Sequence, residues 1–399
     1  MTIQPLPPMP QLKLNTEGKP AIPSWVAPPE TKLDDIQWQP LRTLDLALLD
    51  GTPEQQKECQ ETFAAAVKNE GFVLIKNFGV APAVMQRMYD LANWTLNGDA
   101  LSEEDKKKYE WDFDNGNWAG YKPPIGWSER GKAQPDFMEF YNWYGECWDK
   151  DMIPPKLQPF EDEIRAYASH MYNDVSRRVL VILSRILGLE DNYLWDNVAA
   201  KGHFLPGSCY CRFQAVHSVP ESERSAVGSL LQGHTDHGVC TLIPSQPITC
   251  LQMCGADGVW RYVPYVKDTV VANLGDVMEV ASGGIFKATR HRVIKPVADQ
   301  QDYERVSVIS FNHADPEFPM EPIWHAPLIK EQGVQKDSQV YGAFLKAIEG
   351  GMQTPKFGEW KKFRNLGTQA LQSAQKTVMI NGKPHTENDV GGVKVYREI

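Results

Sequence analysis

The chain has 399 residues, 42% of them hydrophobic, which is enough to bury a substantial core in one large domain or two smaller ones. Its formal net charge is −10, and no block of lysines or arginines marks a surface for nucleic acid, so we expect no nucleic-acid partner. No run reaches the roughly 18 apolar residues of a membrane helix. The first 40 residues are polar and proline-rich, so we expect no signal peptide, no membrane contact and a cytoplasmic location.

The first half of the chain is predicted to be mixed helix and strand. Residues 1–40 are rich in proline and predict an extended arm that lies on the surface or is partly disordered. A long aromatic-rich loop is expected over 109–148, and apolar residues at helical spacing predict one amphipathic helix over 154–187. The shorter elements expected before that loop are a strand at 44–49, a helix over 53–68 capped by Thr52, a buried strand over 72–78, a helix over 83–96 and a short helix opened by Ser102.

From residue 208 to 313 the pattern changes to short strands separated by turns. Ala256-Asp257-Gly258, for example, lies between two apolar runs and predicts a hairpin. Eight such strands predict an α+β protein with a jelly-roll, cupin-like core flanked by helices. Helices are expected near 339–348 and 357–374. The predicted regions are an arm (1–40), an N-terminal region with backing helices (41–200), the jelly-roll core (201–320) and a C-terminal helical extension (321–399).

The seven cysteines predict no disulfide framework. Their number is odd and no two of them form a Cys-x-x-Cys pair, which is also the spacing that zinc sites use. We therefore expect reduced cysteines that pack in the core.

The tripeptide His234-Thr235-Asp236, together with His291, is the main candidate metal site. Two imidazoles and one carboxylate hold one face of an octahedron and leave the other face open, an arrangement that suits non-heme Fe(II). On a strand, residues two apart point to the same face. Nine histidines produce His-x-Asp by chance fairly often, so the tripeptide alone is equally a polar pair at a strand end. His237, next to the tripeptide, is expected to be structural.

A second candidate site is Arg305, with Ser307 two residues further along the same predicted strand face. A guanidinium binds a carboxylate through two parallel hydrogen bonds, so this pair would make a carboxylate clamp. Without the candidate metal ligands His234, Asp236 and His291 upstream, Arg305 would be better interpreted as a surface arginine on an edge strand. Two polar residues near these sites are expected to be structural or exposed: Asp276 caps the turn that follows it, and His217 is solvated in a polar loop.

These motifs occur in an order that resembles the isopenicillin N synthase-like branch of the Fe(II)/2-oxoglutarate oxygenases. The matching stretches, in chain order, are 44–46, 69–79, 101–106, 120–121, 233–238, 241–242, 251–252, 259–264, 270–276, 282–284, 287–293 and 305–307. The resemblance implies the double-stranded β-helix form of the jelly roll. It also implies Fe(II) bound by His234, Asp236 and His291, with 2-oxoglutarate and O2 as cosubstrates. Arg305 and Ser307 would hold the far carboxylate of 2-oxoglutarate.

By the same resemblance, four residues would surround a small organic substrate: Tyr121, Phe137, Phe311 and His313. The implied reaction is oxidation of a substrate C–H bond. Hydroxylation is the default outcome; desaturation, ring closure, ring expansion and demethylation are related outcomes, with secondary metabolism as one setting. The substrate and the oligomeric state stay open.

The strand before the first metal ligand departs from the family pattern. Ala215 and Val216 stand where many relatives have a polar residue and a tyrosine that help to hold the cosubstrate. Arg212 or Gln214, which share a strand face, is therefore expected to bind the near carboxylate of 2-oxoglutarate. Two alternatives remain at this point: an Fe(II) oxidase of the same fold that uses O2 without 2-oxoglutarate, and a non-catalytic protein that binds a small molecule.

Overall fold

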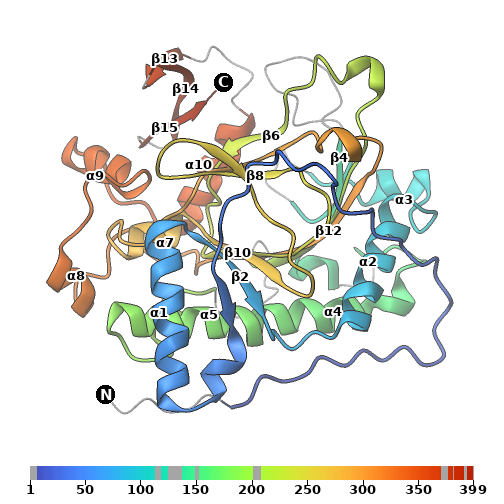
Figure 1. The fold of residues 1–399 in the computed structure, drawn as a ribbon, viewed down its shortest axis with the longest axis horizontal. Helices are drawn as coiled ribbons and strands as arrows, with labels where there is room; N and C mark the ends of the chain where they lie inside the picture. Colours follow the sequence, from blue (N-terminus) through green and yellow to red (C-terminus); the bar gives the residue numbers. More distant parts are fainter. Residues whose placement is uncertain are drawn as a thin grey trace.

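Two facing β-sheets form the centre of the computed structural model, which describes residues 7–112, 118–124, 137–148, 152–200, 208–369, 376–380, 382–390 and 393–398 (Figure 1). The large sheet has the strand order β1-β2-β10-β7-β12-β5-β4-β3, and the small sheet has the order β6-β11-β8-β9. Their bounds are β1 Thr43–Asp45, β2 Phe72–Lys76, β3 Gly120–Lys122, β4 Met138–Trp143, β5 Tyr210–Val216, β6 Ser229–His234, β7 Cys240–Pro244, β8 Leu251–Cys254, β9 Trp260–Tyr262, β10 Val270–Leu274, β11 His291–Ile294 and β12 Arg305–Asn312.

The predicted jelly roll is confirmed. The eight strands β5 to β12 all lie between residues 208 and 313, and the chain passes repeatedly from one sheet to the other. The predicted hairpin is the antiparallel pair β8–β9. Strands from the N-terminal region extend the large sheet at both edges, with β1 and β2 beside β10, and β3 and β4 beside β5. The N-terminal region and the core therefore share one continuous sheet.

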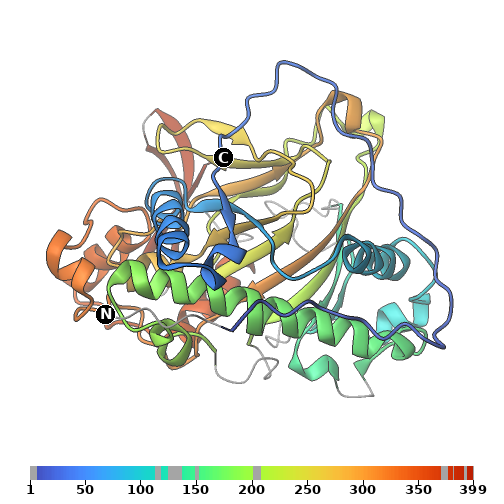
Figure 2. The same ribbon diagram turned by 60° about the horizontal axis from the view of Figure 1, so that its bottom comes forward.

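Helices cover the outer face of the large sheet and both ends of the molecule (Figures 1 and 2). The Thr52 side chain and Gln55 form the reciprocal capping box that starts α1 at Pro53, as its sequence predicted. The bounds of the helices are α1 Pro53–Asn69, α2 Pro82–Leu96, α3 Glu103–Lys108, α4 Glu161–His170, α5 Arg177–Leu187, α6 Tyr193–Asn197, α7 Asp276–Ala281, α8 Pro327–Gln332, α9 Tyr341–Glu349 and α10 Phe357–Gln369.

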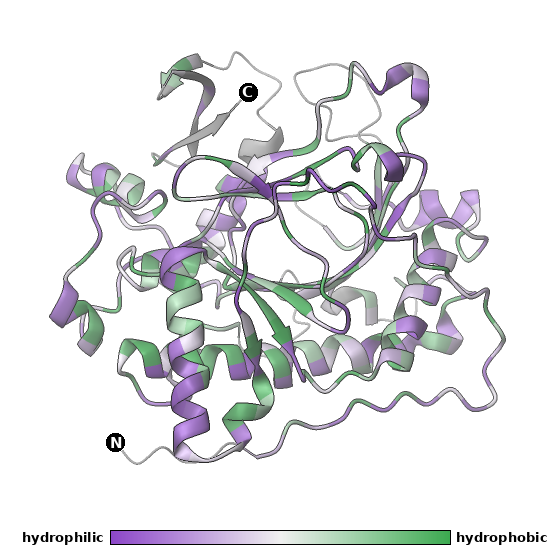
Figure 3. Ribbon diagram, viewed as in Figure 1, coloured by the Kyte–Doolittle hydropathy of each residue, from purple (hydrophilic) through white to green (hydrophobic). Residues whose placement is uncertain are grey.

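Strands of the large sheet are buried on both faces, so their apolar residues serve two cores. In β2, Val73 and Ile75 pack in the main core, which includes residues of α2 and α5. Phe72 and Leu74, on the other face of the same strand, pack in a smaller core with Leu251 and other residues of the small sheet. The strands accordingly appear as continuous apolar runs at the centre of Figure 3. The space between the two sheets is thus partly closed by apolar side chains.

The helix predicted over 154–187 begins later than expected and is not uniform. It consists of α4, a π-helical stretch Met171–Ser176, and α5, and it ends at Gly188, whose φ of 78° is left-handed. Proline lacks a backbone N–H and clashes with the preceding turn. Pro154, Pro155 and Pro159 therefore keep regular helix from forming before Glu161.

Two other predictions were wrong in part. The strand expected at 44–49 ends at Asp45, because the Asp45 side chain accepts a hydrogen bond from Ala47 N (3.0 Å) and starts a 3-10 helix, Leu46–Asp50. The C-terminal extension is helical only as far as α10. It then forms an antiparallel sheet of β13 Lys376–Ile380, β14 Lys383–Val390 and β15 Val393–Glu398. The signal was present as Asn-Gly at 381–382 and Gly-Gly at 391–392, dipeptides that favour hairpins.

The arm lies on the surface along its described part, residues 7–40. It follows the α4–α5 helix and then crosses the edge of the molecule toward β1 (Figure 2). Leu12 N donates to Gly79 O (2.8 Å), and Lys32 N donates to the Asp299 carboxylate (2.8 Å). Contacts so distant in sequence fix the arm against the folded core. Across the described part of the chain, no helix combines the length and apolar character that a membrane span requires.

Candidate active site

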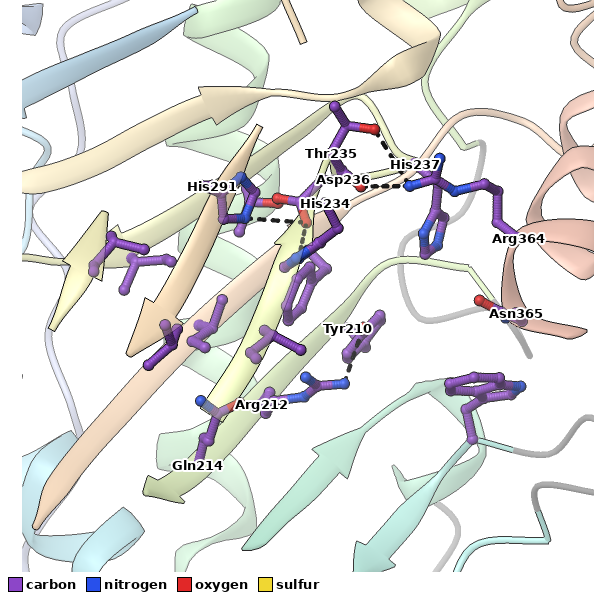
Figure 4. Close-up of a pocket in the computed structure, with 18 of the residues that line it drawn as sticks. Tyr210, Arg212, Gln214, His234, Thr235, Asp236, His237, His291, Arg364 and Asn365 are labelled. Atoms are coloured by element: carbon purple, nitrogen blue, oxygen red, sulfur yellow. Dashed lines mark hydrogen bonds and ion pairs between the residues drawn. The ribbon is translucent and has the colours of Figure 1, made fainter. Parts of the chain in front are cut away.

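His234, Asp236 and His291 converge at one end of a cavity between the two sheets (Figure 4). β6 ends at His234, and β11 begins at His291, its register partner in the small sheet. The spacing of His234 and Asp236 had suggested that both lie on one strand. Asp236 instead lies just beyond the end of β6. Its Oδ1 is 3.7 Å from Nε2 of each histidine, and the three ligand atoms lie within 4.8 Å of one another. One metal ion can therefore be reached by all three side chains.

Hydrogen bonds orient each of these ligands. His234 Nδ1 lies 2.8 Å from Gln232 O, and His291 Nδ1 lies 3.2 Å from Thr289 O. A carbonyl can only accept, so each Nδ1 carries the proton and each Nε2 keeps a lone pair for a metal. This donor set fits Fe(II).

The carboxylate of Asp236 is held in the same way. Its Oδ2 accepts hydrogen bonds from Thr241 Oγ1 (2.6 Å) and Asn273 Nδ2 (2.7 Å), which leaves Oδ1 directed at the two imidazoles. Burial on its own would raise the pKa of Asp236, but attraction to the two histidines in their protonated form, together with these hydrogen bonds, holds that pKa well below its usual value. Asp236 is thus ionised and ready to bind a cation.

Removing the hydrogen bonds to Asp236 should weaken metal binding without removing a ligand. We expect Asn273→Ala and Thr241→Val each to lower metal affinity about 10- to 100-fold, because donors of this kind orient the ligand. Calorimetric titration with Mn(II) or Fe(II) under anaerobic conditions measures the effect. Asn197→Ala, at an exposed helix end, is the control. Wild-type affinity in both variants would show that the hydrogen bonds do not position Asp236.

The cavity has a volume of about 170 Å³ and is open to small molecules. Residues of both sheets and of α10 line it. Besides the triad, the described lining consists of Trp118, Tyr144, Tyr210, Arg212, Gln214, Leu231, Gln232, Thr235, His237, Thr241, Ile243, Leu251, Val293, Arg305, Ile309, Phe311, Lys361, Arg364 and Asn365.

Arg305 and Ser307 are buried side by side on β12, and Arg305 lines the cavity. Arg305 Nε donates to Gln246 Oε1 (3.2 Å), and Ser307 Oγ donates to the same oxygen (3.4 Å). Within the described residues, no carboxylate lies at ion-pair distance from Arg305. Gln246 was missed from the sequence because it follows β7 in a Pro-Ser-Gln-Pro stretch that carries no signal of a binding role.

Arg212 and Gln214 both line the cavity from β5. In the β5–β12 ladder, Gln214 is the register partner of Ser307, whereas Arg212 lies two residues further from the clamp and opposite Ile309. Both side chains therefore face the space between the sheets, as their shared strand face predicted.

Of the four residues expected around a substrate, only Phe311 belongs to the described cavity lining. Tyr121 lies on β3 and donates its hydroxyl to Glu139 Oε1 (2.6 Å) in a buried pair. Phe137 packs against the smaller core between the sheets. His313 is buried beside Lys361, its Nδ1 3.2 Å from the Lys361 Nζ. Those three side chains are engaged elsewhere, which their positions in the sequence could not reveal.

Helix α10 contributes cavity residues that sequence reasoning missed. Lys361, Arg364 and Asn365 project into the cavity, and Arg364 Nη2 donates to Thr235 O (2.6 Å). Asp276 anchors this arrangement, since its carboxylate accepts hydrogen bonds from Thr235 Oγ1 (2.6 Å) and Trp360 Nε1 (3.1 Å). Asp276 is structural, as expected, but it does not cap a turn. It links Thr235, which lies between two of the metal ligands, to α10.

His217 is half-buried and paired, and not simply solvated as we expected. It bridges two carboxylates, with Nε2 2.9 Å from Glu139 Oε2 and Nδ1 3.1 Å from Glu304 Oε1. Hydrogen bonds to Glu139 and Glu304 raise the pKa of His217 from 6.5 to about 9. The charged His217 therefore stabilises the folded protein. This stabilisation is fully present below the unfolded-state pKa of about 6.5 and is lost as the pH rises through about 9.

The expected result for His217→Gln is a pH-dependent loss of stability. We expect the free energy of unfolding to fall by about 1–2 kcal/mol at pH 6, after allowance for solvent screening, and by clearly less at pH 10. Urea denaturation of both proteins across this range measures the difference, with the exposed His325→Gln as control. A difference that does not change with pH would mean that His217 is not charged in the folded protein.

Comparison with known proteins gives matches to two successive parts of the chain. The model described as the 2OG-Fe(II) oxygenase superfamily matches residues 208–314. The model described as the N-terminal region of non-haem dioxygenases in morphine synthesis matches residues 41–161. The N-terminal region and the jelly-roll core are thus both covered.

Three individual proteins illustrate the likeness. Homoarginine-6-hydroxylase 2-ODD-233 of Oryza sativa subsp. japonica is 27% identical over 299 residues, which are 70% of this chain and 85% of that protein. A 1-aminocyclopropane-1-carboxylate oxidase of Persea americana is 31% identical over 196 residues, 48% of this chain and 57% of that one. The crystal structure of a full-length Neurospora crassa protein with alpha-KG and thymine covers 82% of this chain and 97% of its own, with a TM-score of 0.66 at 19% identity, and so shares the fold.

The two family matches follow one another in the chain and meet in one sheet around one cavity. The chain therefore belongs to the Fe(II)- and 2-oxoglutarate-dependent oxygenases, and its cofactors are Fe(II), 2-oxoglutarate and O2.

Proposed function

We propose that the protein oxidises a C–H bond of a small organic molecule in the cavity between its two sheets. His234, Asp236 and His291 would hold Fe(II), and Arg305 with Ser307 would hold the far carboxylate of 2-oxoglutarate. The observation that carries this proposal is the pairing of three converging ligand atoms with a buried guanidinium in the same cavity. Bound Fe(II) with 2-oxoglutarate and O2 supplies the oxidising chemistry, and the protein supplies position.

The residues around the site have separable tasks in this proposal. Thr241 and Asn273 keep Asp236 directed at the metal. Gln246 accepts from Arg305 Nε and so leaves the terminal N–H groups of the guanidinium to donate to a carboxylate. Ser307 Oγ, which donates to the same Gln246 oxygen, would turn its single proton to that carboxylate when the cosubstrate binds. The cavity lining also includes the apolar side chains of Ile243, Leu251 and Val293. These side chains would keep water away from the bound substrate and cosubstrate.

Hydroxylation is the outcome that we propose first. The rice relative is named for a hydroxylation, and the Neurospora crassa structure contains alpha-KG together with a small cyclic molecule, thymine. The cytoplasmic location and the absence of a nucleic-acid partner remain predictions from the sequence.

One experiment tests the proposal against both alternatives. Purified protein is loaded anaerobically with Fe(II), 2-oxoglutarate is titrated, and the metal-to-ligand charge-transfer band is followed. Oxygen is then admitted, and succinate and oxygen consumption are measured with and without 2-oxoglutarate. A charge-transfer band and 2-oxoglutarate-dependent succinate support the proposal. Oxygen consumption that does not need 2-oxoglutarate would support an oxidase, and no consumption under any condition would support a binding protein.

A further inference from the structure

Arg212 is a buried cation that has no acidic partner among the described residues. It is 6% exposed, and no described carboxylate lies at ion-pair distance from it. Its Nε donates to Asn142 Oδ1 (2.7 Å), and its Nη2 donates to Tyr210 Oη (3.3 Å), both of them neutral acceptors. Burying a charge is costly unless it is paired. The guanidinium faces the cavity, so its partner is expected to be an anionic ligand.

Aromatic rings surround this guanidinium. Its Cζ lies 3.9 Å from the centre of the Phe140 ring and 4.9 Å from that of Phe311. Tyr210 stacks on Phe311 with ring centres 4.7 Å apart, and Tyr144 stacks on Tyr210 at 4.1 Å. Tyr144, Tyr210 and Phe311 all line the cavity. A planar apolar group can therefore lie against rings while an acidic group reaches Arg212.

The charges of the described cavity lining also favour an anion beyond 2-oxoglutarate. Asp236 and the two carboxylates of 2-oxoglutarate together balance Fe(II) and one arginine, Arg305. Asp276 lies 3.4 Å from Arg364 and balances it. Lys361 of α10 contacts His313 Nδ1 (3.2 Å), and Arg212 is a further cation of the described lining. One further carboxylate on a ligand would neutralise Arg212.

The position of Arg212 favours the substrate over the cosubstrate. Val216, four residues along β5 from Arg212, is the register partner of Arg305. A separation of four residues along a strand places the Cα atoms of Arg212 and Val216 ~13 Å apart. Arg212 Nη2 donates to Tyr210 (Figure 4). Its guanidinium also lies over the Phe311 ring, and Tyr210 and Phe311 are a register pair still further from Arg305. The guanidinium thus points away from the clamp at which 2-oxoglutarate is expected.

We infer that the substrate is a small ring-bearing carboxylic acid, with its carboxylate on Arg212 and its ring against Tyr210 and Phe311. This inference rests on the proposed function, because it places 2-oxoglutarate at Arg305 and the oxidised C–H bond near the metal triad. From the sequence we expected Arg212 or Gln214 to hold the near carboxylate of 2-oxoglutarate; this inference assigns Arg212 to the substrate instead.

Matched acids and amides test the inference. The probes are phenylacetate, cinnamate and indole-3-acetate, each compared with its carboxamide, which keeps the ring and shape but lacks the charge. Binding to the anaerobic Fe(II)–2-oxoglutarate enzyme is measured by calorimetry. At least one acid should bind tenfold or more tightly than its amide. If every acid binds no better than its amide, or no probe binds at all, the inference is wrong.

Variants then assign the effect to Arg212. We expect Arg212→Met, which keeps an apolar side chain between the rings, to weaken acid binding about 10- to 100-fold and amide binding less than about threefold. Arg212→Lys should restore part of the loss, because it keeps the charge but not the planar fork. Arg177→Met is the matched control, since Arg177 also bonds an asparagine and stacks on a ring but lies outside the cavity lining.

The affinity for 2-oxoglutarate, read from the charge-transfer band, separates this inference from the proposed function. It should change less than about threefold in Arg212→Met. If 2-oxoglutarate binding falls instead and the preference for acids persists, Arg212 serves the cosubstrate and the inference is overturned. If the wild type shows no charge-transfer band, the proposed use of 2-oxoglutarate fails, whatever the acids and amides show.

Discussion

Replacing His234, Asp236 or His291 with alanine should reduce turnover at least about 1000-fold, because each side chain supplies one of only three protein ligands to the metal. A loss of about 4 kcal/mol in the stabilisation of the reacting complex corresponds to that factor. The affinity for Fe(II) should fall in each variant as well. Steady-state succinate formation and anaerobic metal titration measure the two effects.

The fold should survive these substitutions. Both cores consist of apolar side chains from the sheets and helices, and the triad lies outside them. The metal-free His234→Ala and His291→Ala variants should therefore melt within about 3 °C of the metal-free wild type. Asp236→Asn accompanies Asp236→Ala, because alanine would leave the Thr241 and Asn273 donors without an acceptor. His325→Ala, on an exposed histidine, is the control. Any triad variant with wild-type turnover would remove that residue from the metal site.

Replacing Arg305 with alanine should have the second largest effect, on the binding of 2-oxoglutarate. The loss of a charge-assisted, bidentate hydrogen bond costs about 2–4 kcal/mol, so the affinity should fall roughly 30- to 1000-fold. Arg305→Ala also removes one of the two donors to Gln246 Oε1, which keeps only the hydrogen bond from Ser307 Oγ. The charge-transfer band under anaerobic conditions gives the affinity directly.

Arg305→Lys should recover only part of the affinity, since an ammonium group cannot form the planar fork. Arg261→Ala, which removes an exposed partner of Asp257, is the control for loss of an arginine elsewhere. If Arg305→Ala binds 2-oxoglutarate as the wild type does, the cosubstrate is held at another place.

Several features could be predicted from the sequence because local chemistry decides them. Thr52 and Pro53 start α1 through a capping box that involves only neighbouring residues. Turn residues between short apolar runs indicated the jelly-roll strands. The antiparallel pair β8–β9 confirms the hairpin predicted at one of these turns. The residues of the metal triad could be named from their types and order, although their convergence depends on the folding of the 54 residues between Asp236 and His291.

Tertiary structure alone decided which polar groups have partners. His217 is charged because Glu139 and Glu304, 78 and 87 residues away, meet at its ring. Tyr121 is removed from the cavity by the same Glu139. Arg212 is the converse case, since folding surrounds it with rings and amides and supplies no described carboxylate. The energy of a buried charge depends on the atoms within a few ångströms of it. Those atoms come from strands and helices distant in the chain, so the sequence by itself could identify the arginine but not its missing partner.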